Sequence, residues 1–284
     1  MSNITFAFFG TDEFSVAVLE RLARNGLTPS VVITAPNRPQ GRGLVLMSPP
    51  ATIWAEQHSI RVLQPERLDD DFGATLTAAQ CPLFVVASYG SLLPKSILSI
   101  PAHGVLNVHP SLLPKYRGSS PLESAILADD KNTGVTIMCM DEKMDHGPIV
   151  AQQEISLPDW PPKRSELARM LAEAGGALLS EIIPHWISGK KTSVAQDETR
   201  ATYTKKITKE DGLIDLTENP YKNFLKIRAF DGWPGTYFFT EQKSKKVRVV
   251  IKEARYENDL LRILRVVPEG KKEMEYDDFL RGFQ

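Results

Sequence analysis

The sequence predicts an α/β protein whose first and larger domain is built on a mostly parallel sheet. Up to residue 189, short apolar runs rich in Val, Ile and Phe alternate with segments of helical spacing, which is typical of strands covered by helices on both faces. After residue 189 the chain becomes polar and then carries short β-type runs around one helix. We therefore expect a first domain at residues 1–189, a linker at 190–202 and a small, partial β-barrel domain at 203–284.

The early strands of the first domain are compact apolar runs, which we expect to join through right-handed crossovers. These strands are expected at residues 4–9, 30–34, 83–87 and 105–109. Between these strands, three segments have apolar residues at helical spacing, and the pattern is weakest in the last segment. The helices are expected at residues 14–24, 53–58 and 72–79.

The end of the first domain is expected to hold two adjacent strands and one long helix. The strands are predicted at residues 133–140 and 148–157, so that Asp145 lies between them. A Pro-Pro pair at 161–162 suits the entry of a helix, and the helix is predicted over 164–187.

The small second domain has a weaker pattern. We expect a helix at 221–230 and strands at 246–251 and 260–267. The segment between Lys252 and the last of these strands is too short for the middle strands of a full barrel. The domain is therefore expected to be truncated, and its closure as a barrel is left open.

Composition excludes several classes of protein. The 284 residues hold 34 Lys and Arg against 35 Asp and Glu, so a nucleic-acid partner would need a local basic patch. The two cysteines, Cys81 and Cys139, lack metal-ligand spacing and indicate a reducing compartment. The apolar run at 4–9 is too short to span a membrane. We expect a cytoplasmic enzyme without a metal or a membrane segment.

The first strand ends at Gly10, which is a sign of a tight strand-to-helix turn. The second and third glycines of a dinucleotide fingerprint are missing, so we do not expect a nicotinamide site. Thr11 or Asp12 is instead expected to cap the helix that follows.

Two arginines, Arg38 and Arg42, lie among glycine and proline in a loop expected at residues 37–50. An arginine between two glycines can approach a phosphate or ribose closely, because its neighbours have no side chains. The alternative is a mobile, solvated surface loop. We favour contact with a substrate.

The most informative group of residues is Asn107, His109 and Asp145. Asn107 and His109 are two residues apart at the end of a predicted strand, so they project to the same face. In open parallel sheets, ligands bind beyond the carboxyl ends of the strands, where these residues fall. The alternative, that Asn107 and His109 only satisfy backbone groups, is less attractive because an amide, an imidazole and a carboxylate occur together.

These three groups suit the transfer of a one-carbon acyl unit to an amine. The reaction needs a donor aimed at the developing oxyanion and a path for the proton that the amine loses. Asn107 supplies an amide N–H, cationic His109 supplies a charged donor, and Asp145 would favour and orient that ring. Proton movement could run through His109 or a bound water. The amine itself attacks, so no nucleophilic Ser or Cys is required.

At these residues the chain resembles the folate-dependent formyltransferases, from Phe9-Gly10-Thr11 to Asp278-Phe279-Leu280-Arg281-Gly282. The resemblance implies a Rossmann-like formyltransferase domain followed by a shortened OB-like barrel. It implies that 10-formyltetrahydrofolate donates the formyl group and that the methionine amine on initiator tRNA accepts it. Asn107, His109 and Asp145 match the family's catalytic trio.

The resemblance also assigns binding residues. The turn implied to contact folate is Ser111, Leu112, Leu113 and Pro114, and the loop implied to lie beside the pterin supplies Ser88, Tyr89, Gly90 and Leu93. The residues implied to bind tRNA are Arg38, Arg42, Lys245, Lys246, Lys271 and Lys272, with Arg42 nearest the acceptor end.

The chain departs from the family's pattern at three positions. Leu44, Val45 and Thr52 stand where members commonly have lysines. Fewer cations mean fewer phosphate contacts, so tRNA binding is expected to be weaker. We expect the protein to be a monomer.

Three other functions are weighed. An N-formyltransferase acting on an amino-sugar nucleotide shares the trio but is disfavoured by the Arg42 loop and the Gly-Lys-Lys sequence at 270–272. A formyltetrahydrofolate hydrolase would be expected to carry a regulatory domain before the first strand. A folate- or RNA-binding relic would require a broken active site, and all three catalytic residues are present.

Overall fold

The structure is a computed structural model that describes residues 4–40, 45–242 and 245–282. It contains two compact units that interleave along the sequence. Unit 1 comprises Met1–Gly118, Thr133–Ile155 and Ala168–Tyr203, and unit 2 comprises Ser119–Asn132, Ser156–Leu167 and Thr204–Gln284. The sequence-based division at residues 189 and 202 is a different partition, and it stays a prediction.

Unit 1 is built on a seven-stranded sheet in the order β5-β2-β1-β6-β7-β8-β9. All strand pairs from β5 to β7 are parallel, whereas β8 and β9 join antiparallel. The strands are β1 (Ala7–Phe9), β2 (Val31–Ile33), β5 (Arg61–Leu63), β6 (Phe84–Val86), β7 (Val105–His109), β8 (Thr133–Cys139) and β9 (Ile149–Ile155). The mostly parallel α/β sheet predicted from the alternating pattern is thus confirmed.

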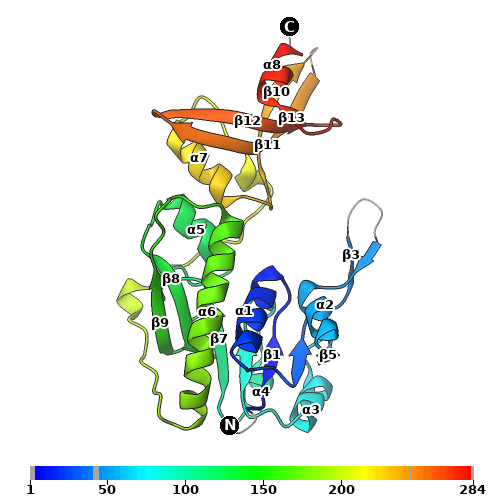
Figure 1. Ribbon diagram of the computed structural model, residues 1–284, viewed down its shortest axis with the longest axis vertical. Helices are drawn as coiled ribbons and strands as arrows, with labels where there is room; N and C mark the ends of the chain where they lie inside the picture. The colour runs from blue at the N-terminus through cyan, green and yellow to red at the C-terminus, as the bar shows by residue number, and fades with distance from the viewer. Residues whose placement is uncertain (1–3, 41–44, 243–244, 283–284) are drawn as a thin grey trace. The chain divides into compact units, whose positions relative to one another are not determined.

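Helices connect and cover these strands. They are α1 (Glu13–Arg24), α2 (Pro50–Gln57), α3 (Asp70–Ala78), α4 (Lys95–Leu98) and α6 (Arg164–Ile187). Figure 1 shows α6 running alongside β7–β9. The approach is close, because a Cβ built on Gly175 would lie 2.5 Å from Val108 and 3.0 Å from Val135. Gly175 therefore lets α6 lie directly on β7 and β8.

The turn after β1 is held by the side chain that caps α1. Asp12 Oδ1 accepts hydrogen bonds from the backbone N–H groups of Phe14 and Ser15. The expected cap is therefore confirmed at Asp12, whereas the Thr11 hydroxyl donates to the Tyr89 carbonyl at 2.9 Å.

The prediction of a loop at residues 37–50 is wrong in part, because this segment contains a short antiparallel hairpin. Its strands are β3 (Arg38–Gln40) and β4 (Val45–Met47), paired from Arg38↔Met47 to Gln40↔Val45. The Gly- and Pro-rich composition hid this hairpin. The strand β5 and the helix α4 were also not predicted. β5 begins with an exposed arginine and is only partly buried, so it lacks the continuous apolar run of β1, β2 and β6, and α4 has only four residues.

Unit 2 has a four-stranded antiparallel sheet in the order β10-β11-β12-β13. Its strands are β10 (Thr236–Gln242), β11 (Lys245–Glu257), β12 (Leu260–Pro268) and β13 (Met274–Glu275), and its helices are α5 (Pro121–Leu127), α7 (Pro220–Ala229) and α8 (Tyr276–Arg281). Phe238, Val249, Ile251, Val266 and Phe279 form its core. No pairing joins β10 to β13 among the described strands, so the sheet is an open, barrel-like one. The closure that the sequence left open is therefore absent among these strands.

Two short 3₁₀ turns complete the chain, η1 (Glu198–Arg200) and η2 (Glu210–Gly212). Within the described ranges, no helix has both the length and the hydropathy that crossing a membrane requires.

Candidate active site

Asn107 and His109 lie on β7, where the sheet changes from parallel to antiparallel pairing. β7 pairs in parallel with β6 and antiparallel with β8, and Asn107 faces Met138 while His109 faces Thr136. Their alternate positions place both side chains on one face, as the sequence predicts. Both are buried, with 8% of Asn107 and 4% of His109 exposed, so neither is an ordinary solvated surface residue.

Asp145 lies in the loop between β8 and β9, and this loop is tightly folded. Asp145 has a φ of 49°, in the left-handed region that few non-glycine residues adopt. A Cβ built on Gly147 would lie 1.8 Å from the carbonyl oxygen of Cys139, so only glycine fits there. The Asp145 carboxylate accepts a 2.7 Å hydrogen bond from the backbone N–H of Gly118 through Oδ2. The loop thus presents the carboxylate in a fixed direction.

The two nitrogens of His109 face different oxygen atoms. Nε2 lies 3.0 Å from the Tyr116 carbonyl, to which it donates because a carbonyl only accepts. Nδ1 lies 3.7 Å from Asp145 Oδ1, which is longer than a hydrogen bond. Nδ1 is therefore the ring nitrogen that faces the carboxylate without a hydrogen bond, and it can donate to a substrate oxygen that approaches beside Asp145.

The amide of Asn107 makes no hydrogen bond to any of the residues that the structure describes. An amide that is mostly buried and without a protein partner can give its N–H to a bound ligand. Together, Asn107 and His109 can supply two donors to one small oxygen, and Asp145 supplies the compensating negative charge. This arrangement suits the stabilisation of an oxyanion that forms during acyl transfer.

The turn at residues 111–114 is held against β8 and β9. Thr136 Oγ1 donates to the Ser111 carbonyl at 2.6 Å and accepts from the Leu113 N–H at 3.1 Å. Gln152 Nε2 donates to the Leu113 carbonyl at 2.7 Å. Ser111 and Leu113 are buried, whereas Leu112 and Pro114 are partly exposed. The turn is thus rigid and begins two residues after His109.

The loop at residues 88–93 is fixed to the turn after β1. Ser88 Oγ donates to Asp12 Oδ2 at 2.7 Å, and Ser88 and Gly90 both have positive φ. Tyr89 and Leu93 are buried, and burial raises the pKa of Tyr89 to about 12. Ser88 and Gly90 are exposed, so the loop offers backbone and hydroxyl groups above a buried tyrosine.

The residues predicted to bind tRNA lie on exposed positions where they are described. In unit 1, Arg38 is exposed on β3, and Arg42 lies outside the described residues. In unit 2, Lys245 and Lys246 begin β11, and Lys246 Nζ lies 4.3 Å from the centre of the Phe239 ring. Two further exposed lysines of unit 2 follow β12; they are Lys271 and Lys272.

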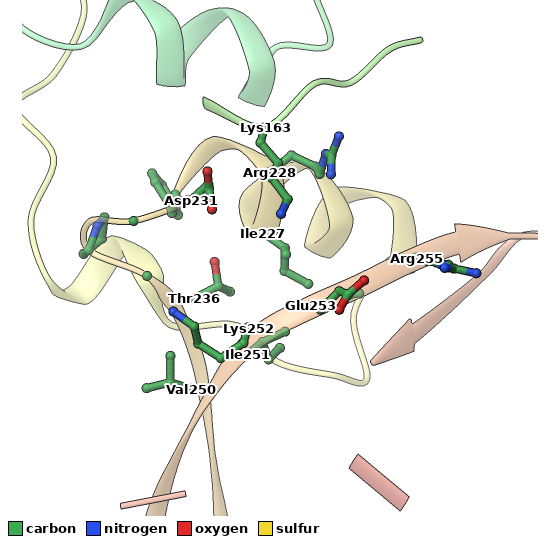
Figure 2. Close-up of a pocket in the computed structure, with 15 residues that line it drawn as sticks. Lys163, Ile227, Arg228, Asp231, Thr236, Val250, Ile251, Lys252, Glu253 and Arg255 are labelled. Atoms are coloured by element: carbon green, nitrogen blue, oxygen red, sulfur yellow. The ribbon is translucent and has the colours of Figure 1, made fainter. Parts of the chain in front are cut away.

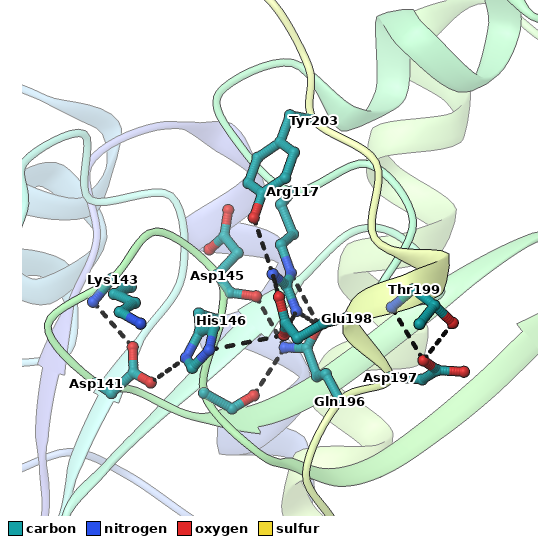
Figure 3. A network of polar contacts seen from close by, with 11 residues as sticks. Arg117, Asp141, Lys143, Asp145, His146, Gln196, Asp197, Glu198, Thr199 and Tyr203 are labelled. Atoms are coloured by element: carbon teal, nitrogen blue, oxygen red, sulfur yellow. Dashed lines mark hydrogen bonds and ion pairs between the residues drawn. The ribbon is translucent and has the colours of Figure 1, made fainter.

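The sequence did not single out a group of polar residues next to the trio. Figure 3 shows Arg117, Gln196, Glu198 and Tyr203 joined by hydrogen bonds close to Asp145. Arg117 follows the turn at 111–114 in the sequence, but its partners Gln196 and Glu198 come from the polar stretch that was expected to be a linker. In the structure this stretch is anchored to unit 1, and Val194 also exchanges backbone hydrogen bonds with Ile149.

Unit 2 contains a separate cavity of about 250 Å³ between the end of α7 and β11 (Figure 2). Its charged lining is mixed and consists of Lys163, Arg228, Asp231, Lys252, Glu253 and Arg255. It contains none of the catalytic candidates. In the described part of the chain, no three His, Cys, Asp or Glu side chains cluster as metal ligands would.

Comparison with known families adds independent information. The family described as "Formyl transferase" matches residues 2–183, and "Formyl transferase, C-terminal domain" matches residues 206–260. The chain is 39% identical over 297 residues to the methionyl-tRNA formyltransferase of Halalkalibacterium halodurans, covering 97% of this chain and 93% of that protein. It is 44% identical over 233 residues to the methionyl-tRNA formyltransferase of Chloroflexus aurantiacus, covering 82% of this chain and 75% of that one.

Solved structures share the fold at lower identity. The methionyl-tRNA formyltransferase from Clostridium thermocellum matches with a TM-score of 0.63 and 14% identity, covering 96% of this chain and 99% of that one. A 4-N formyltransferase from Francisella tularensis matches with a TM-score of 0.65 and 20% identity, covering 89% of this chain and all of that one. At such identities the likeness concerns the fold, and it does not separate one acceptor from another.

Proposed function

Because the chain belongs to the formyl transferase family, we propose that it is a methionyl-tRNA formyltransferase. The reaction moves the formyl group of 10-formyltetrahydrofolate to the α-amino group of methionine esterified to initiator tRNA. The product is N-formylmethionyl-tRNA, which serves translation initiation. Both the folate and the aminoacyl-tRNA are substrates in this reaction.

One observation carries the proposal. Asn107 and His109 share a face of β7 and Asp145 faces His109, in a chain similar to named methionyl-tRNA formyltransferases along 97% of its length. The trio accounts for formyl transfer to an amine. The acceptor is supported by the extent of the similarity, which includes the C-terminal domain.

The reaction exchanges one C–N bond for another. The amine nitrogen attacks the formyl carbon, the bond between that carbon and folate N10 breaks, and the proton lost by the amine is matched by one gained at N10. The formyl oxygen carries negative charge in the transition state, and the Asn107 amide and His109 Nδ1–H are placed to donate to it. Asp145 faces the ring and is proposed to orient it during this step.

The amine needs little help from a base. A model α-amino group has a pKa of about 7.7–8.0, so a useful fraction is unprotonated near neutral pH. Stabilisation of the oxyanion is therefore the larger demand on the protein. The proton can leave through a water beside Asp145, or through His109 once the ring has given up its own Nδ1 proton.

The turn at 111–114 and the loop at 88–93 are proposed to hold the folate. Their backbones are fixed to β8, β9 and the turn after β1, so they can present groups to a ligand without rearranging. The proposed contacts are Ser111, Leu112, Leu113, Pro114, Ser88, Tyr89, Gly90 and Leu93.

The tRNA is proposed to contact Arg38, Arg42, Lys245, Lys246, Lys271 and Lys272. Two of the positions where family members commonly carry lysines are described: Val45 is exposed and apolar, and Thr52 is buried in α2. Neither can contribute a phosphate contact here, so we expect weaker binding that still depends on salt. Binding of initiator tRNA measured against salt concentration tests this, and a slope near zero contradicts it.

The proposal includes a monomer in the cytoplasm, where translation initiates. Sedimentation at concentrations above those used for activity tests the oligomeric state, with a mass of 31.7 kDa expected. A stable dimer contradicts that part of the proposal alone.

The acceptor is tested by direct comparison. The protein is incubated with 10-formyltetrahydrofolate and either initiator methionyl-tRNA, uncharged tRNA, an amino-sugar nucleotide or water. We expect formylation of methionyl-tRNA only. Faster formylation of the amino-sugar nucleotide would favour the sugar N-formyltransferase, and release of formate without any acceptor would favour the hydrolase.

A further inference from the structure

Arg117 is a fully buried cation close to the proposed active site. Its side chain has no exposed surface, and Figure 3 shows it enclosed by polar groups of unit 1. Nε and Nη2 donate to Gln196 Oε1 at 3.1 and 2.9 Å. Nη1 and Nη2 donate to the two carboxylate oxygens of Glu198 at 3.0 and 2.6 Å, and Nη1 also donates to the Tyr203 hydroxyl at 3.0 Å. These bonds use the full set of guanidinium donors.

The pair of Arg117 and Glu198 is held in its charged form. Hydrogen bonds to Glu198 raise the pKa of the Arg117 guanidinium, and the same bonds lower the pKa of Glu198. A buried charge is tolerated only where it is paired and hydrogen-bonded, so these partners explain how Arg117 can lie out of contact with water. A planar group with five satisfied donors has one orientation, and so do the residues that accept from it.

Gln196 connects the Arg117 side chain to the loop that carries Asp145. A guanidinium only donates, so Gln196 Oε1 must face Arg117 and Nε2 must face the opposite side. There Nε2 donates to the carbonyl oxygens of Asp145 at 2.8 Å and of Gly147 at 2.7 Å. One amide therefore holds two carbonyls of the loop that carries the catalytic carboxylate.

The backbone on each side of Arg117 contacts the trio directly. The carbonyl of Tyr116 accepts from His109 Nε2, and the N–H of Gly118 donates to Asp145 Oδ2. The N–H of Arg117 itself donates to the Thr202 carbonyl at 2.9 Å. Arg117 touches neither catalytic side chain, yet the three residues from 116 to 118 hold both His109 and Asp145.

We propose that Arg117, acting through Gln196, is a positioning residue that sets the Asp145 carboxylate against the His109 ring. The proposal rests on the function proposed above, because the alignment of Asp145 and His109 affects the rate only if both act in formyl transfer. A displacement of about 1 Å in a catalytic group can slow a reaction up to about 100-fold, and the 3.7 Å between Nδ1 and Asp145 Oδ1 leaves little margin.

The sharpest test removes the donors of Gln196 and keeps its acceptors. Gln196→Glu can still accept from Arg117 but cannot donate to the carbonyls of Asp145 and Gly147. We expect kcat for formyl transfer to fall roughly 10- to 100-fold, with the KM for the folate close to that of the wild type. The thermal midpoint is expected to fall as well, because two buried carbonyls lose their donor, and the double-mutant cycle below separates this effect from positioning. Gln196→Met, which also removes the acceptor, is expected to lose at least as much.

The matched control is Asp197→Asn, in the adjacent position. Asp197 accepts only from Thr199, through its N–H and its hydroxyl, and does not contact Arg117. An asparagine can keep both hydrogen bonds. We expect this variant to retain the activity of the wild type.

A double-mutant cycle separates positioning from general stability. If Gln196 acts through Asp145, then Gln196→Glu should cost little further rate in an Asp145→Asn background, because the group that it positions is already lost. The same fold-loss in both backgrounds, or a Gln196→Glu enzyme with wild-type kcat, would overturn the proposal.

A second readout does not depend on the acceptor. The chain has five histidines, and the ring signals of His109 can be followed by NMR with labelled histidine. We expect Gln196→Glu to shift the His109 signals and Asp197→Asn to leave them in place. Unshifted signals in Gln196→Glu overturn the positioning role even if the proposed substrate is wrong. Failure to formylate methionyl-tRNA with shifted signals counts against the proposed function and supports the positioning role.

Discussion

The backbone N–H of Gly118 donates to the carboxylate of Asp145 at 2.7 Å, across 27 residues of sequence. This contact joins the turn that follows β7 to the loop between β8 and β9. It leaves the other carboxylate oxygen facing His109 Nδ1 at 3.7 Å. The trio is thus assembled by the fold around β7, and changes at each member have separable consequences.

Removing the amide of Asn107 is expected to affect the rate and not the binding of folate. Asn107→Ala should lower kcat roughly 100- to 1,000-fold, as loss of an oxyanion donor does elsewhere. This corresponds to a loss of about 2.7–4 kcal/mol of transition-state stabilisation. Steady-state kinetics and folate titration by fluorescence provide the measurement. Near-normal turnover would show that Asn107 has no such role.

Asp145→Asn keeps the size of the side chain and an oxygen that can accept from Gly118, but it removes the charge beside His109. We expect a large loss of kcat with folate binding retained. The matched control is Glu142→Gln in the same loop, where Glu142 forms an exposed ion pair with Lys95 at 2.9 Å. Such exposed pairs contribute about 0–1 kcal/mol, so the control should keep its rate. Equal rates in the two variants would contradict the assignment.

Two glycine substitutions are expected to change stability in opposite directions. Gly147→Ala would place a methyl 1.8 Å from the Cys139 carbonyl oxygen, so the loop must shift, at a cost of about 1–3 kcal/mol. Gly73→Ala lies inside α3, and its nearest neighbour would be Ile97 Cδ1 at 3.6 Å. Alanine is favoured there by about 1 kcal/mol, so this variant should be more stable. Urea unfolding measures both. Equal stability of the two variants would show that the loop has room for a methyl group at position 147, in contradiction to the structure.

Acid should weaken the bond between Arg117 and Glu198. Because the pKa of Glu198 is lowered in the folded protein, the interaction contributes stability above the usual value of 4.5 and is lost as the pH falls through the lower folded value. The difference in unfolding free energy between the wild type and Glu198→Gln should therefore be present above 4.5 and shrink as the pH falls below 4.5. A difference that persists unchanged to pH 3 would contradict this.

The sequence predicted the part of the fold around Asn107, His109 and Asp145 well because its signals are local. The buried run at 105–109 gave β7, and a spacing of two put Asn107 and His109 on one face. The long helix α6 has the predicted bounds, 164–187, and the Pro-Pro pair at 161–162 marks its start. Asp145 was expected between two adjacent strands and lies between β8 and β9.

Other features depend on contacts that no local pattern reveals. Arg117 binds Gln196 and Glu198, which are 79 and 81 residues away in a stretch whose polarity is typical of linkers. The strand β10 was missed although it is aromatic; it follows directly on a Trp-Pro-Gly turn, pairs with β11 and places Phe238 in the core of unit 2. The polar network around Arg117 can be recognised only once the fold brings its members together.

The most direct test of the central claim follows an isotope-labelled formyl group through a single turnover. Wild-type protein loaded with labelled 10-formyltetrahydrofolate and mixed with initiator methionyl-tRNA should transfer the label to the methionyl amine, and His109→Gln should do so at least about 100-fold more slowly. Label that stays on the folate, is released as formate, or reaches the tRNA at the same rate in both proteins would contradict the account.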